Sequence, residues 1–172
     1  MLRIIVYGLI AIITLCLQSS YLKFIEIRGV TPNIVIAFIV SYSIIRGKKE
    51  GAILALFIGI THDIMYGKVI GCYSLIYFYI GYFSGYFNKH FYEDNYLLSI
   101  LMISLCDLIY GVYVYFFTFL FRGRLNISFY FFEIIIPEVV FTTVFSLLIY
   151  KFVLIINAKV IKKEQFYKPR LK

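Results

Sequence analysis

Three apolar runs follow one another between residues 30 and 87, and the connectors between them are too short for separate soluble units. The runs cover about 30–45, 51–65 and 69–87, and only the basic turn Arg46–Glu50 and the stretch from His62 to Lys68 interrupt them. Transmembrane β-strands alternate in polarity over about 10 residues, whereas these runs are continuously apolar. This pattern predicts closely packed helices in a membrane.

The composition supports the same conclusion. The chain has 172 residues, of which 62% are hydrophobic and 15% are charged, whereas a soluble domain is about 45–50% apolar and about 25% charged. A chain of this length predicts one domain. Lys and Arg outnumber Asp and Glu by 17 to 9. Because these basic residues flank apolar runs, they favour orientation in a membrane over nucleic-acid binding.

Six apolar stretches predict an all-α, polytopic integral membrane protein with six transmembrane helices. The expected spans are about 4–20, 30–45, 51–65, 69–87, 96–121 and 128–156, followed by a basic tail at 157–172. The second and third spans are short, since about 15 residues rise only ~23 Å across a hydrocarbon core of ~30 Å. Either their polar flanks enter the membrane or the bilayer thins there.

The distribution of basic residues predicts the orientation. With six spans and the amino terminus inside, twelve of the 17 Lys and Arg residues lie on the inner side and five on the outer side. This bias predicts a multi-pass membrane protein with both termini in the cytoplasm. The tail from Lys159 onward would either lie against anionic lipid or be solvated.

Small residues recur at every fourth position in the third and fourth apolar runs, on one face of each expected helix. Such faces let two helix axes approach closely. They either pack helices of this chain together or dock a partner, and internal packing is favoured because the motif is common in helix bundles. The residues are Gly51, Ala55 and Gly59, then Gly81 and Gly85.

Three acidic residues lie within or at the edge of the expected spans: Asp63, Asp107 and Glu138. Charge in a span is costly and marks a functional or a paired structural site. Asp63 stands at a boundary beside His62, where it could be solvated. The three acids could form a proton or ion path, or they could hold helices together through hydrogen bonds. We favour hydrogen-bonded pairing.

The sequence shows no catalytic, cofactor-binding or metal-binding constellation. His62 and His90 are the only histidines, and no HExxH, Ser/His/Asp, Walker or glycine-rich nucleotide motif is present. We therefore expect no enzymatic activity, no cofactor and no metal site. The three cysteines have no CxxC spacing and are expected to be small buried hydrophobes.

The stretch from Val30 to Phe87 resembles the MreD family of bacterial rod shape-determining membrane proteins. The family usually has Pro-Asp where this chain has Pro32-Asn33, and an apolar residue or Gln before Asp63 where this chain has His62. The matching positions, besides the basic turn, are Pro32, Asn33, Gly59, Asp63, Gly67, Gly71, Tyr77, Gly81, Tyr82 and Gly85.

This resemblance implies a non-enzymatic scaffold of the cell-elongation machinery in the bacterial plasma (inner) membrane. Such a scaffold regulates cell shape and couples MreC and MreB to peptidoglycan synthesis. The implied partners are a single-span MreC-type protein and, indirectly, actin-like MreB, the RodA glycosyltransferase and a class B penicillin-binding protein, besides membrane lipid. The hypothesis is that the small-residue faces hold the central helices so that the MreC-type helix can dock.

The expected fold is also similar to the substrate-binding S components of energy-coupling-factor vitamin transporters. This similarity supplies the alternative function, a small-molecule carrier. S components carry an AxxxA-like pair on the first helix, whereas this chain has only Gly8 and Ala11 there. A third possibility, a proton-linked transporter or channel, rests on the three intramembrane acids alone.

Overall fold

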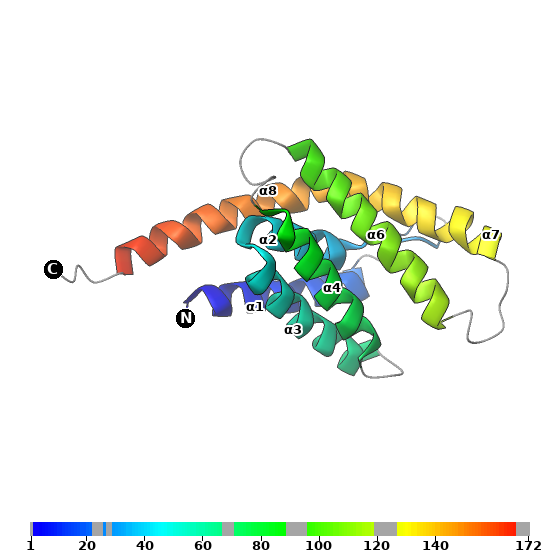
Figure 1. The fold of residues 1–172 in the computed structure, drawn as a ribbon, viewed down its shortest axis with the longest axis horizontal. Coiled ribbons are helices and arrows are strands. Elements are labelled where there is room, and N and C mark those ends of the chain that lie inside the picture. The colour runs from blue at the N-terminus through cyan, green and yellow to red at the C-terminus, as the bar shows by residue number, and fades with distance from the viewer. Residues whose placement is uncertain are drawn as a thin grey trace.

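The computed structural model describes residues 2–21, 26, 29–66, 71–88, 96–118 and 127–167, and the regular elements in this part of the chain are helices. They build a bundle of six helical rods (Figure 1), which confirms the predicted all-α fold with six helices. The elements are α1 (Leu2–Cys16) with π-helix η1 (Leu17–Tyr21), α2 (Ile34–Arg46), α3 (Lys48–Tyr66), α4 (Cys72–Tyr86), α6 (Tyr96–Thr118), and α7 (Ile127–Tyr130) running through η4 (Phe131–Ile135) into α8 (Ile136–Tyr167).

Helix α2 is the central helix of the bundle. Every residue from Val35 to Ile45 is buried, and α2 contacts α1, α3, α4, α6 and α8. A helix that is apolar on all sides is stable only when it is enclosed. It begins at Ile34 because Pro32 has no backbone N–H to donate, and because Asn33 Oδ1 accepts the N–H of Ile36 at 3.2 Å. The short second run is therefore surrounded by protein.

Helix α3 starts before the predicted span at 51–65, because most of the basic turn is helical. Only Gly47, with φ +90°, separates α2 from α3. The 19 residues of α3 rise about 28 Å at 1.5 Å each, close to the ~30 Å of a hydrocarbon core. The polar flank Lys48–Glu50 thus belongs to the helix. Helices α3 and α4 lie side by side and antiparallel (Figure 1).

The last rod extends beyond its predicted end at residue 156. From α7 through η4 and α8 it continues to Tyr167, and Figure 1 shows its carboxyl end projecting past the other helices. The exposed Lys162 and Lys163 are therefore carried on a helix, and the first part of the basic tail at 157–172 is helical up to Tyr167.

Many large apolar side chains are exposed, while several polar ones are buried. Ser41, Ser84 and Ser146 are completely buried, whereas Leu97 and Leu148 are about 70% exposed. In the described part of the chain two helical stretches, Tyr96–Phe117 and Ser128–Lys163, are long and apolar enough to cross a membrane, and Val6–Ser19 and Ile34–Arg46 are shorter apolar helices. Less than a third of the most apolar window of each long stretch is buried, as expected for helices that face lipid.

The basic segments meet at one end of the bundle. The Tyr7 hydroxyl donates to Asn157 Oδ1 at 3.4 Å, and the Arg46 guanidinium lies 5.8 Å from the centre of the Tyr7 ring. These contacts join the amino-terminal helix, the turn after α2 and the start of the basic part of α8. Asp63 lies near the opposite end of α3.

Candidate functional site

The small-residue rows of α3 and α4 face each other. A Cβ atom on Gly81 would lie 2.6 Å from the Cβ of Ala55 and 2.7 Å from the carbonyl oxygen of Gly51. A Cβ on Gly85 would lie 2.6 Å from the Cα of Lys48. Real Cβ atoms do not approach other heavy atoms so closely, so the backbones of the two helices touch here.

Gly51 and Gly59 of α3 also pack against other helices of the same molecule. A side chain on Gly51 would collide with Ser43 of α2, and one on Gly59 would collide with the backbone of Ser74 in α4. All five predicted small residues therefore line contacts between helices of the same molecule, because Ala55 itself is fully buried against Gly81. Their faces are not available to a partner in this arrangement.

Asp63 caps the amino terminus of α4. Its carboxylate accepts the backbone N–H groups of Gly71 (3.0 Å), Tyr73 (3.0 Å) and Ser74 (2.9 Å), and it also accepts the Ser74 hydroxyl. Only 1% of Asp63 is exposed. Gly71 has φ +109°, which a residue with a side chain rarely adopts. The first N–H groups of a helix lack intrahelical partners and attract negative charge. The interpretation that Asp63 is solvated is therefore wrong.

Three other family-motif residues, Pro32, Asn33 and Gly67, belong to the start of α2 and to the stretch between α3 and α4. Pro32 and Asn33 are buried. Gln18 of η1 holds this segment, since its amide nitrogen donates to the Pro32 carbonyl (3.2 Å) and its oxygen accepts the Ile34 N–H (2.9 Å). No sequence motif points to this role for Gln18. Gly67 lies outside the described residues.

A buried polar cluster joins α2, α6 and α8. The Asn33 backbone N–H donates to Thr142 Oγ1 at 2.9 Å, and Asn33, Asp107 and Thr142 are each less than 5% exposed. The side chains of Asn33 and Thr142 approach the Asp107 carboxylate, yet neither Asp107 oxygen has a hydrogen-bond partner among the described residues. Glu138 interacts electrostatically with Asp107 and also approaches Asn33. Of the three predicted acids, the structure brings together Asp107 and Glu138.

Tyrosines of α4 and α6 lie next to this cluster. The hydroxyls of Tyr77 and Tyr110 are 3.5 Å apart, and the Tyr77 hydroxyl lies 3.5 Å from Nδ1 of His62. Both tyrosines interact electrostatically with Glu138. The Tyr113 hydroxyl donates to the Cys72 carbonyl at 3.0 Å. Tyr77, Tyr110 and Tyr113 thus have polar partners, which a hydroxyl in an apolar environment requires.

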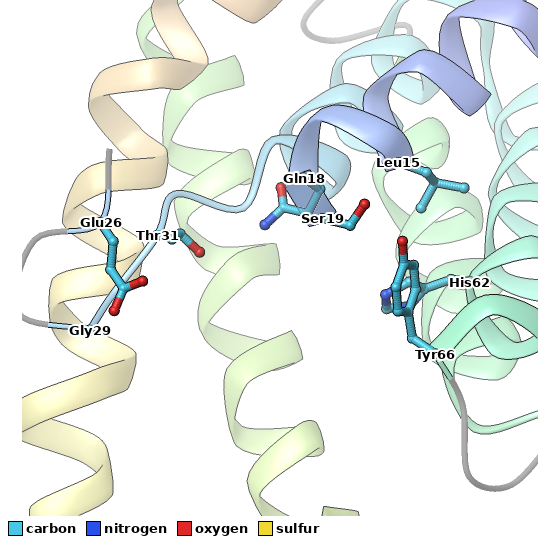
Figure 2. Close-up of a pocket in the computed structure, with 8 residues that line it drawn as sticks. All are labelled: Leu15, Gln18, Ser19, Glu26, Gly29, Thr31, His62 and Tyr66. Carbon is cyan, nitrogen blue, oxygen red and sulfur yellow. The ribbon is translucent and has the colours of Figure 1, made fainter. Parts of the chain in front are cut away.

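A polar cavity of about 370 Å³ lies at the Asp63 end of the bundle. In Figure 2, side chains of the first helical rod and of α3 gather on one side, the loop before α2 forms the other side, and Gln18 lies between them. Its polar lining can form hydrogen bonds with a small molecule. The lining residues are Leu15, Gln18, Ser19, Glu26, Gly29, Thr31, His62 and Tyr66.

A second, mostly apolar groove of about 340 Å³ runs between α1 and α3 at the basic end. Gly8 lines it, and a Cβ atom there would meet no heavy atom within 4 Å. Ile53, Leu54 and Phe57 of α3 provide apolar surface. On its floor the Tyr42 hydroxyl donates to Glu50 Oε2 at 3.3 Å. The groove therefore has free space next to Gly8.

In a comparison with protein families, the model for rod shape-determining protein MreD matches residues 1–156. No curated protein and no solved structure matches the chain. The matched region includes the α3–α4 contact, the Asp63 cap and the buried polar cluster, and it ends inside α8.

Proposed function

Because the chain belongs to the MreD family of rod shape-determining proteins, we propose that this membrane protein is a non-enzymatic scaffold of the cell-elongation machinery. It holds the membrane helix of an MreC-type protein, and through that protein it couples actin-like MreB, the RodA glycosyltransferase and a class B penicillin-binding protein to peptidoglycan synthesis. The family match over residues 1–156 carries the cell-shape role.

The proposed scaffold crosses the plasma membrane six times and has both termini in the cytoplasm. Its exposed apolar side chains and buried serines support contact with lipid on most sides. The meeting of Tyr7, Arg46 and Asn157 supports a single basic end, which the charge bias assigns to the cytoplasm.

The open groove between α1 and α3 supports docking of one transmembrane helix. The small-residue rows of α3 and α4 are already used inside the molecule, so a partner must bind elsewhere. Gly8 offers the closest approach, because nothing lies within 4 Å of its Cβ position. A small residue in an apolar groove is the usual contact between helices in lipid. We therefore place the helix of the MreC-type partner against Gly8, Ile53 and Phe57.

Substitution Gly8→Trp tests this docking site. The indole would fill the groove, so recovery of a co-expressed MreC-type partner in detergent pull-down should fall about tenfold or more, which corresponds to about 1.4 kcal/mol. Leu148→Trp is the matched control, since Leu148 is 69% exposed on α8 and the larger side chain would lie in lipid. Equal recovery of the partner with both variants would exclude this groove as the docking site.

A small-molecule carrier is the second candidate function, and the polar cavity of Figure 2 is the observation that favours it. Its volume of about 370 Å³ falls in the range of ligand sites. Nanomolar binding of a vitamin to the purified protein would favour this function over the scaffold.

A further inference from the structure

The buried polar cluster of α2, α6 and α8 carries an inference that is independent of the scaffold function. It contains two carboxylates, Asp107 and Glu138, which interact with each other. Among the described residues neither carboxylate forms an ion pair. Two negative charges enclosed together without a positive charge are strongly unfavourable. The cluster therefore needs a positive charge that the described side chains do not supply.

The environment of the Asp107 carboxylate oxygens indicates whether a proton or a metal ion supplies this positive charge. This residue is 1% exposed, and both of its carboxylate oxygens lack a hydrogen-bond partner in the described structure. A single proton would leave one of the two carboxylates charged. A metal ion can contact both oxygens at once, and small cations such as Na⁺, Mg²⁺ and Ca²⁺ prefer carboxylate, carbonyl and hydroxyl oxygens.

A hydroxyl oxygen adjoins the carboxylates, since Thr142 approaches Asp107. The amide nitrogen of Asn33 is the group that approaches both acids, because Asn33 Oδ1 accepts the Ile36 N–H. The other described titratable groups that interact with these acids are Tyr77, Tyr110, Tyr130 and Cys106, none of which is a cation. Directly before Glu138 the helix hydrogen-bond pattern changes at η4 and Pro137, and such π-segments are frequent at functional sites.

We propose that Asp107, Glu138 and Thr142 form a binding site for one small metal cation with oxygen ligands. The cation links α6 and α8 next to α2, and it neutralises the carboxylate pair. Binding of the cation to this site stabilises the contact between the helices that carry Asp107 and Glu138.

The test uses the purified full chain in detergent, treated with EDTA and exchanged into choline chloride. Unfolding is followed by tyrosine fluorescence, since the chain has 17 Tyr and no Trp. NaCl, KCl, MgCl₂ and CaCl₂ are titrated separately at constant ionic strength and pH. One of these cations should raise Tm saturably, by about 5 °C or more at a hundredfold excess over Kd. A radioactive isotope of that cation should bind at one ion per chain.

Two variants assign the effect to the cluster. D107N and E138Q should each abolish the cation-dependent rise in Tm, and in choline D107N should be at least as stable as the wild type because the repulsion is relieved. Glu133→Gln is the matched control, since Glu133 is an exposed acid of η4 and should keep the full response. If D107N cannot be purified, E138Q alone decides.

Three outcomes would overturn the proposal. The first is a wild-type Tm that is the same in every salt. The second is an unchanged cation response in both D107N and E138Q, which would place the ion elsewhere. The third is a Tm that depends on pH through Asp107 but on none of the four metals, which would make the occupant a proton.

Discussion

At the scale of single residues, two buried aspartates of this chain have opposite environments. Each is 1% exposed. Asp63 accepts three backbone N–H groups and a hydroxyl, whereas the oxygens of Asp107 accept no hydrogen bond among the described residues. A carboxylate at a helix amino terminus is stabilised by charge and by donors together. Asp63 therefore has a structural role, and Asp107 is the candidate ligand.

Removing the Asp63 carboxylate should loosen the start of α4. We expect Asp63→Ala to lower the free energy of unfolding by about 3 kcal/mol, because buried N–H donors lose a charged acceptor. Ser74→Ala removes one donor to Asp63 and should cost only about 1 kcal/mol. Denaturant titration of the purified protein in detergent measures both values. Wild-type stability in Asp63→Ala would show that the cap does not hold α4.

At the scale of elements, helices α3 and α4 pack closely because glycines without side chains lie at their contact. Glycines allow the two backbones to touch, as the positions of Gly81 and Gly85 against α3 show. Apolar burial gives little drive between helices in lipid, so close packing has to supply the attraction. The α3–α4 contact uses the small-residue face of α3, whereas the groove between α1 and α3 is lined by other residues of that helix.

A Cβ at the α3–α4 contact should separate the helices. Gly81→Ala should lower stability by about 2 kcal/mol through overpacking, and adding Ala55→Gly should restore part of the loss, because the Ala55 Cβ is the nearest obstacle at 2.6 Å. Gly8→Ala is the control, since its Cβ meets nothing within 4 Å, and helix propensity should make it neutral or slightly stabilising. Thermal unfolding compares the four proteins. The contact is not rigid if Gly81→Ala and Gly8→Ala behave alike.

At the scale of the whole molecule, the charges separate the two ends of the bundle. The turn after α2 and the basic part of α8 meet at one end through Tyr7, and the polar cavity with His62 and Tyr66 lies at the other. A bilayer orients a protein by such an asymmetry of Lys and Arg.

Cysteine labelling tests this orientation. In a variant without Cys16, Cys72 and Cys106, a single cysteine replaces either Lys49 or Met65, both of which are exposed. A membrane-impermeant maleimide added to intact spheroplasts should label the cysteine at 65 and should reach the cysteine at 49 only after lysis. The reverse pattern would invert the proposed topology.

The sequence was sufficient for properties that depend on local composition. Continuous apolar runs predicted helices, and the spacing of Gly51, Ala55 and Gly59 predicted a close-packing face. The ends of the helices were predicted less accurately, because they depend on single hydrogen-bonding groups. Asn33 delays the start of α2 by capping it, and nothing local ends α8 before Tyr167. No sequence pattern indicated the roles of Gln18 and Ser74, since these roles come from hydrogen bonds to other helices of the bundle.

The sequence by itself determined that this chain is an all-helical membrane protein, because continuous apolar runs are a local property of the sequence. Its motif residues between Val30 and Phe87 were enough to indicate the MreD family. Only the tertiary structure decided which faces meet. It enclosed the apolar helix α2, matched Gly81 to Ala55, attached Asp63 to α4 and placed Asp107 beside Glu138. These contacts join residues far apart in the chain, and which of them form depends on how all six helices pack at once.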